Sequence, residues 1–191
     1  SPGHTTLTLQ SDGRWNIDSF FDITYRIDFV GHPGGSLGGM SGSTTGTIRM
    51  QSGQPAPPPP APCTVAANAD GSVDLPPVGC GYVSPADLHM MINGLPPGTE
   101  LHIAAQHERF INVTHTPGGP LGGKSETFGS SLLLVVNGTG DLATYHRTLQ
   151  MQAQCQTATA PDSPGSNIQS FDTQMTGLQG QLPPGDPDFD L

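Results

Sequence analysis

A short acidic segment near the middle of the sequence carries the most specific chemical pattern, because its oxygen-bearing side chains alternate around a glycine. Asn68, Asp70 and Asp74 have the spacing of the first ligands of a calcium loop, but the bidentate glutamate that completes such a loop is missing. Two interpretations stay open. Either these three residues bind calcium as a cofactor, or they form a turn with solvated side chains. A second set of alternating carboxylates offers the same choice: Asp186, Asp188 and Asp190.

The motifs of common catalytic sites are missing or lie in the wrong context. No His-Glu-x-x-His motif occurs, and residues 34–38 (GGSLG) and 118–125 (GGPLGGKS) match the strings Gly-x-Ser-x-Gly and Gly-x-x-x-x-Gly-Lys-Ser but lie in predicted hairpins rather than between a strand and a helix, so we interpret their glycines as turn formers. His102 and His107 are five positions apart on a predicted strand, so they face opposite sides and cannot chelate one ion together without a bulge. Ordinary polar histidines are the favoured interpretation, and a transition-metal site is the alternative. Asp22 and Glu108 could serve as paired carboxylates of a glycosidase, yet they are ionisable residues on predicted strands and nothing more. We therefore expect that the protein is not an enzyme.

The three cysteines are too far apart for a Cys-x-x-Cys motif and do not stand beside a histidine at metal-ligand spacing. A disulfide between Cys63 and Cys80 would close the Asp/Gly/Pro-rich loop between them, which leaves Cys155 as an odd thiol or as an alternative partner. The competing interpretation is three buried free cysteines in a reducing compartment.

Two sequons, at Asn112 and Asn137, permit N-glycosylation in a cell that has the machinery. Sequons also occur by chance. Glycosylation of Asn112 and Asn137 is thus a hypothesis that the sequence alone does not decide.

The net charge of −10 argues against two classes of partner. Sixteen acidic residues face only six basic ones, and nucleic acids and anionic membranes are bound by clustered Lys and Arg. No apolar run approaches the length of about 20 residues that a membrane-spanning helix needs. We expect no nucleic-acid partner and no membrane span. Because the first residue is Ser1, we expect that the N-terminus was processed or that the chain was cut from something longer, so that any export signal is already gone.

Alternation of apolar and polar residues predicts that the strands hold the core. In residues 17–29 the odd positions carry Ile, Phe and Tyr and the even positions carry Asp, Thr and Arg, which is typical of a long strand with one dry and one wet face. Similar patterns predict strands at 101–113, 127–136 and 146–155, and a pair near 171–175 and 178–182. With 26 glycines and 20 prolines interrupting helices, the chain is predicted to be all-β, an antiparallel β-sandwich.

One short helix is predicted near residues 85–93. Ser84 can act as its N-cap, Pro85 suits the first helical position and Asp87 the first turn, and Gly94 follows the last apolar residue. The Pro-Pro-Gly sequence that begins at Pro96 forces the chain out of the helix.

A glycine-rich pattern occurs twice. Residues 33–41 and residues 117–125 match at seven of nine positions, at an offset of 84 residues, which indicates internally duplicated hairpins. We divide the chain into a first hairpin segment at 1–53, a Pro-rich spacer at 54–62 and a β-sandwich with the short helix at 63–191. A piece as small as 1–53 buries too little apolar surface to fold alone, so it must pack on the rest of the chain or on a neighbour.

Three segments together carry a resemblance to known proteins: residues 19–25 (SFFDITY), the two Pro-Gly-Gly-x-Leu-Gly-Gly loops and residues 185–190 (GDPDFD). They resemble modules found in tandem in large secreted proteins of environmental bacteria. In such arrays the Asp-Pro-Asp-Phe-Asp segment runs on, after a short connector, into a start like residues 1–6. The resemblance implies an extracellular, repetitive context and no activity.

These observations favour a structural module of an extracellular filament, sheath or surface array. Near the C-terminal end, Asp and apolar residues alternate as in a strand just beginning, so we expect terminal strands to complete the sheet of another copy. The partners would then be copies of the chain itself. The alternative is an adhesin or carbohydrate-binding module, which would need exposed aromatic residues such as Trp15.

Overall fold

The computed structural model describes residues 1–53, 63–77, 80–83, 88–90, 96–162, 165–182 and 184–189. The all-β prediction is confirmed, since strands make up most of the described chain. They are β1 (Pro2–Leu9), β2 (Arg14–Val30), β3 (Ser41–Gly53), β4 (Cys63–Ala66), β5 (Gly81–Val83), β6 (Leu88–Met90), β7 (Leu101–Pro117), β8 (Lys124–Gly138), β9 (His146–Thr159) and β10 (Ile168–Gln181). The Pro-rich spacer predicted at 54–62 lies outside the described residues.

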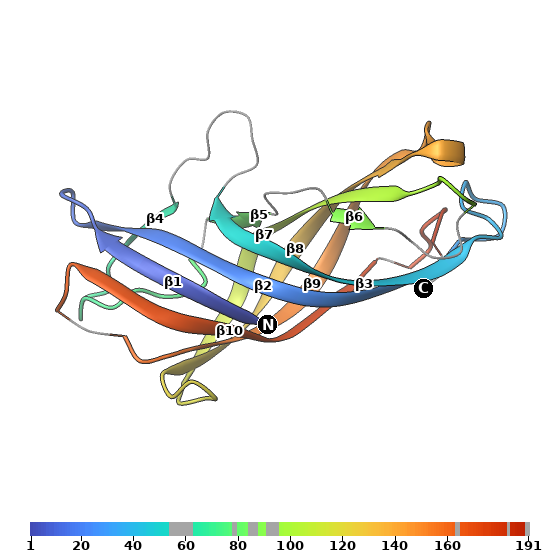
Figure 1. Cartoon of the computed structure of the whole chain (residues 1–191). Helices are drawn as coiled ribbons and strands as arrows, with labels where there is room; N and C mark the ends of the chain where they lie inside the picture. Colours follow the sequence, from blue (N-terminus) through green and yellow to red (C-terminus); the bar gives the residue numbers. More distant parts are fainter. Residues whose placement is uncertain are drawn as a thin grey trace.

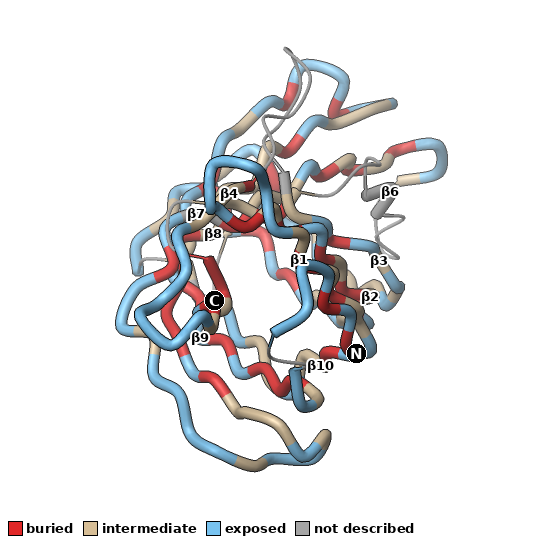
Figure 2. The backbone as a smooth tube through the Cα atoms, turned by 90° about the vertical axis from the view of Figure 1, so that its left-hand side faces the viewer, coloured by how far each residue is buried: buried red, intermediate tan, exposed pale blue. Residues whose placement is uncertain are grey.

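The described strands form one antiparallel sheet, so the predicted β-sandwich is not confirmed. Its order is β1-β10-β9-β8-β7-β5-β3-β2-β4, with β6 as a further neighbour of β7. Because β1 pairs with β10 on one side and with β2 on the other, the sheet returns on itself. Figure 2 shows the strands arranged in a ring. Strands of the predicted segments 1–53 and 63–191 share this sheet, and the division between them stays a prediction.

The long predicted strand at 17–29 lies within β2, and its alternation sets which side chains face the interior. Trp15, Ile17, Phe21 and Ile23 are buried, whereas the even-numbered residues between them are exposed or half-buried. The pair of strands predicted near 171–175 and 178–182 is one strand, β10, in which the register with β9 shifts between Met175 and Gly177. A β-bulge therefore joins what the sequence pattern separated.

The predicted helix is wrong where the structure describes it. Residues 88–90 form β6, which pairs with residues 101–103 of β7. The turn at 96–98, closed by a hydrogen bond from Thr99 N to Pro96 O (3.0 Å), folds the chain back onto β7. Pairing with β7 outweighs the local helix signal, as tertiary context often does. The remainder of the predicted helix, including Ser84, Pro85 and Asp87, lies outside the described residues.

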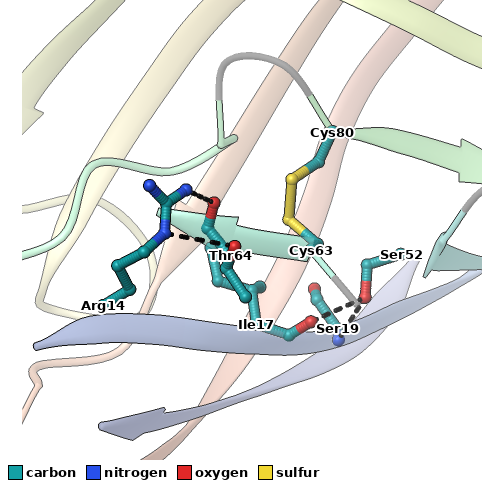
Figure 3. The surroundings of a disulfide bond; sticks show 7 residues. All are labelled: Arg14, Ile17, Ser19, Ser52, Cys63, Thr64 and Cys80. Atoms are coloured by element: carbon teal, nitrogen blue, oxygen red, sulfur yellow. Dashed lines mark hydrogen bonds between the residues drawn. A yellow bond between two sulfur atoms is a disulfide. The ribbon is translucent and has the colours of Figure 1, made fainter. Parts of the chain in front are cut away.

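A disulfide joins Cys63 at the start of β4 to Cys80, which directly precedes β5 (Figure 3). β4 pairs with the first residues of β2, and β5 lies between β3 and β7, so the bond ties two short strands at the same part of the sheet. Around it a small cluster is buried: Leu7, Trp15, Ile17, Cys63, Val73 and Phe171. Cys155, the third cysteine, is a buried free thiol.

The sheet has a closed end and an open end. At the closed end, β1 fills the space between β2 residues 15–21 and β10 residues 168–174. At the open end, β2 and β3 continue past the start of β1 (Figure 1), and among the described residues no strand lies between β2 residues 22–30 and β10 residues 176–181. This difference positions the sites described below.

The two glycine-rich loops each connect neighbouring strands, one between β2 and β3 and the other between β7 and β8. They lie at different places in the fold, the first at the right of Figure 1 and the second at the bottom. Leu37 in the first loop is fully buried, whereas Leu121 in the second is half-buried. Each loop keeps the same role as a hairpin turn, and the duplication inferred from the sequence stays a prediction.

Candidate functional site

The acidic segment predicted to bind calcium forms a turn whose polar atoms bond to one another. Asn68 Nδ2 donates to Asp74 Oδ1 (3.2 Å) and to Ser72 Oγ (3.0 Å), and Asp70 Oδ1 accepts from Ser72 N (3.0 Å). Hydrogen bonds from Ser72 hold the pKa of Asp70 below its ordinary value. No cluster of three or more His, Cys, Asp or Glu side chains able to hold a metal occurs in the described part of the chain. Calcium at Asn68, Asp70 and Asp74 stays a prediction.

The second acidic set contacts an arginine. Arg147 Nη1 donates to Asp186 Oδ1 (2.8 Å) and to Asp188 Oδ2 (2.7 Å), and its Nη2 donates to Asp186 Oδ2 (2.9 Å). Asp188 also accepts from Tyr145 Oη (3.2 Å) and from Ser36 N (3.1 Å). We call this contact the Arg147 clamp. It fixes the C-terminal segment 184–189 to β9 and to the loop between β2 and β3, while Asp190 lies outside the described residues.

The ion pairs of the Arg147 clamp favour the charged form of each partner. Burial raises the pKa of Asp186 and Asp188, but hydrogen bonds from Arg147 and from backbone amides outweigh it, so both carboxyl groups have a pKa below the ordinary value. The same bonds raise the pKa of Arg147. Both aspartates are therefore ionised at neutral pH and paired with a cation that the protein itself supplies.

A buried polar chain lies in the middle of the core. His107 Nδ1 and Ser130 Oγ are 2.8 Å apart, and Ser130 Oγ lies 3.6 Å from Cys155 Sγ. Burial lowers the pKa of His107 to about 4, and burial raises the pKa of the Cys155 thiol against a hydrogen bond from Ser130. Nucleophilic catalysis by cysteine needs an accessible thiolate, and burial of Cys155 disfavours both the access and the thiolate.

A polar cavity of about 230 Å³ lies at the closed end. Glu126 is its buried carboxylate, and it accepts hydrogen bonds from Thr157 Oγ1 (3.0 Å) and Thr159 Oγ1 (3.4 Å). Burial raises the pKa of Glu126, opposed by these hydroxyls and by His115 and Lys124. Sequence reasoning missed Glu126. It lies two residues before the inward-facing Phe128 on β8, so both side chains share one face of the strand, and the alternation could have revealed it.

An apolar groove of about 620 Å³ occupies the open end. One wall is β2, the floor is formed by β7, β8 and β9, and the other wall is β10 with the C-terminal segment. Its lining is mainly apolar: Ile23, Tyr25, Ile27, Phe29, Ile48, Met50, Leu101, Ile103, Leu132, Leu134, Val136, Leu149, Met151, Met175, Leu178, Leu182 and Phe189.

The wall formed by β2 also has unpaired backbone. Thr24 N donates to Ser1 Oγ (3.3 Å) and His32 N donates to Asp188 O (2.9 Å), whereas Gly31 N donates to Met40 O of the β3 side (2.8 Å). Backbone direction alternates along a strand, so the even residues from 24 to 30 turn their N–H and C=O groups away from β3. The antiparallel bridge between Gly31 and Phe189 brings the C-terminal segment alongside residue 30, and in the described part of the chain no strand accepts the groups of residues 26 and 28. We call residues 24–30, on this side, the open edge.

The remaining predicted site residues lie apart from one another. Asn112 and Asn137 are both exposed, so glycosylation stays a prediction that their positions allow. Asp22 is bound by Arg49 (2.7 Å to each carboxylate oxygen), and the side chain of Glu108 is outside what the structure describes. Trp15 is only 5% exposed, so it packs in the core instead of offering a ring to a sugar.

Comparisons with known protein families, with characterised proteins and with solved structures return no match. Among the described residues, no helix has the length and apolar character to cross a membrane.

Proposed function

We propose that the chain is a structural module of an extracellular filament, sheath or surface array, and that its copies assemble through sheet-edge and terminal-strand contacts. The single observation that carries the proposal is the open edge beside the apolar groove. A strand edge with free N–H and C=O groups pairs readily with another strand, and natural proteins usually blunt or cover such an edge. Along this edge the exposed Arg26 and Asp28 are charged side chains of the kind that blunt an edge, but in the described part of the chain no strand covers their backbone.

The extracellular location is supported by the disulfide and by the charge. A Cys63–Cys80 bond persists in oxidising surroundings and is rare in reducing ones. With one lysine and five arginines, the chain offers few sites to trypsin-like proteases. Both properties suit a protein that works outside the cell.

The alternative of a carbohydrate-binding module has less support among the described residues. Trp15, Tyr82 and Tyr145 are buried and Tyr25 is half-buried in the wall of the groove, whereas sugar recognition would need such rings on the surface. We further propose a non-enzymatic role, because the polar groups described above bond to one another or lie buried.

The proposal is tested by the mass of the purified chain as a function of concentration. Light scattering after gel filtration should show species heavier than one chain that grow with concentration, and electron microscopy should show regular assemblies. A chain that stays a monomer at every concentration, with no assemblies on the grid, would contradict the proposed function.

A further inference from the structure

The apolar groove is where a partner strand would bind in the proposed assembly. We infer that the groove binds an extended segment of a second copy of this chain, which pairs with the open edge antiparallel to β2. This inference rests on the proposed function and adds to it the site, the direction and the side-chain pattern of the contact.

An extended peptide fits the groove better than a small apolar molecule does. A lipid or hydrocarbon could fill the space between the apolar walls, but it cannot satisfy the backbone groups of residues 26 and 28. A strand satisfies them and buries its own apolar side chains in the same step. β10 residues 176–181 have no described partner on the side away from β9, so the inserted strand can pair on both sides, as β1 does at the closed end.

The direction of the partner strand follows from the two ends of the chain, which lie at the two ends of the open edge. Gly3 pairs with Phe21, which puts Ser1 opposite Ile23, and Phe189 forms an antiparallel bridge with Gly31. Both terminal segments are therefore antiparallel to β2. Between the positions opposite Ser1 and opposite Phe189 lie seven β2 residues, 24 to 30. They span about 23 Å at 3.3 Å per residue.

The side-chain pattern follows from the parity of β2. Residues opposite Tyr25 and Ile27 would point into the groove, and those opposite Arg26 and Asp28 would point to solvent. A partner strand thus needs apolar residues at two alternating positions. The chain's own ends already obey this rule, because Phe189 packs on Phe29 (ring centroids 6.5 Å apart) and the printed sequence continues from it as Asp-Leu. A second copy carries the same alternation, which is why we assign the groove to it.

The inference can be tested by making the chain fill its own groove. In the register set by Phe189 and Gly31, five residues added after Leu191 would lie opposite β2 residues 28 to 24. The extension Thr-Val-Thr-Val-Thr puts both valines into the groove, whereas the matched control Thr-Asp-Thr-Asp-Thr puts carboxylates there. We expect the valine extension to abolish assembly and raise the melting temperature, and the aspartate extension to leave assembly as in the native chain.

A pair of proline variants tests which edge is used. Arg26 and Thr45 are directly opposite each other in the β2–β3 hairpin and both are exposed, but Arg26 N faces the groove and Thr45 N faces the outer side of β3. Arg26→Pro should weaken assembly at least tenfold and Thr45→Pro should not, with circular dichroism showing that both are folded.

The outcomes separate the two proposals. Assembly of the native chain that neither the valine extension nor Arg26→Pro reduces would overturn the groove inference and leave the proposed function standing. Failure of the native chain to assemble would overturn both. A low-mass apolar molecule found in the groove of assembled material by native mass spectrometry would also overturn the strand inference.

Discussion

The two halves of β2 have the same alternating pattern but different surroundings. At the closed end Ile17, Ser19 and Phe21 are buried, and this half of β2 pairs with β1 on one side and with β4 and β3 on the other. At the open end Tyr25 and Ile27 face the same interior and are only half-buried. The difference is the missing neighbour, because β1 covers one half and ends before the other. Periodicity therefore shows which side chains face inward, and pairing decides whether that interior is complete.

The largest difference should come from truncating one inward-facing residue at each end. Phe128→Ala removes a buried ring that contacts Phe110 edge-on (centroids 5.4 Å apart) and should lower the free energy of unfolding by about 3 to 5 kcal/mol. Ile27→Ala, in the half-buried wall of the groove, should cost the monomer about 1 kcal/mol or less. Urea unfolding of both variants measures the contrast, and equal losses would show that the open end is as well packed as the closed end.

Removing the disulfide should weaken the closed end next most strongly. Cys63 and Cys80 are 17 residues apart, and opening a loop of that size typically costs about 3 kcal/mol. The double variant Cys63→Ser/Cys80→Ser should unfold at lower urea, yet its open edge should exchange amide protons as in the native chain. Cys155→Ser is the control for losing a thiol without a bond. A double variant as stable as the native chain would show that the disulfide does not support the closed end.

The buried imidazole at the junction of the two ends should make stability depend on pH. The pKa of His107 is about 4 in the folded chain against 6.5 for an ordinary histidine. At a pH between these values, the histidine is protonated in the unfolded chain and neutral in the folded chain. Stability should fall by about 2 kcal/mol as the pH drops from 7 to 4.5. Glu126, whose pKa is raised, acts in the opposite sense in this range. The difference between the native chain and His107→Gln isolates the histidine, and parallel pH profiles would exclude its role.

The Arg147 clamp should give the smallest effect, confined to the C-terminal segment at the open end. Arg147→Gln leaves two largely buried carboxylates without their cation and should favour release of residues 184–189 by about 1 to 3 kcal/mol. Limited proteolysis and hydrogen exchange of this segment measure the release. Arg26→Gln breaks an exposed ion pair with Asp28 and should change little. Equal protection of the segment in both variants would show that other contacts hold it. In the native chain, acidification through the low pKa of Asp186 and Asp188 should release it as well.

Local patterns predicted the strands well because the alternation of apolar and polar residues is a property of the local sequence. The strand at 17–29 and the pairing of Cys63 with Cys80 could be predicted, since a long period-two run and a short cysteine spacing have few alternatives. The error at the predicted helix near 85–93 could not be foreseen, because residues 88–90 form a strand by pairing with an edge of β7 that exists only in the folded sheet. Within β7 itself, Arg109 and Asn112 adopt positive φ (49° and 54°) where the register with β8 shifts, and no local signal marks these positions.

The candidate sites were harder to predict because their residues meet across long sequence distances. Asp186 and Asp188 resemble metal ligands in sequence, yet Arg147, about 40 positions away, takes that role in the fold. Glu126 and Thr157 are neighbours only because β8 pairs with β9. The closure of the sheet by β1 depends on pairing between residues near the two ends of the chain. Such contacts follow from topology, which a single sequence does not specify.

Hydrogen exchange of the amides along β2 tests the central claim most directly. In assembled material the amides of Arg26 and Asp28 should be protected, and in the monomer they should exchange freely, while those of Tyr25 and Ile27, which bond to β3, stay protected in both. Protection of Arg26 and Asp28 that does not change between monomer and assembly would contradict the claim that copies join along this edge.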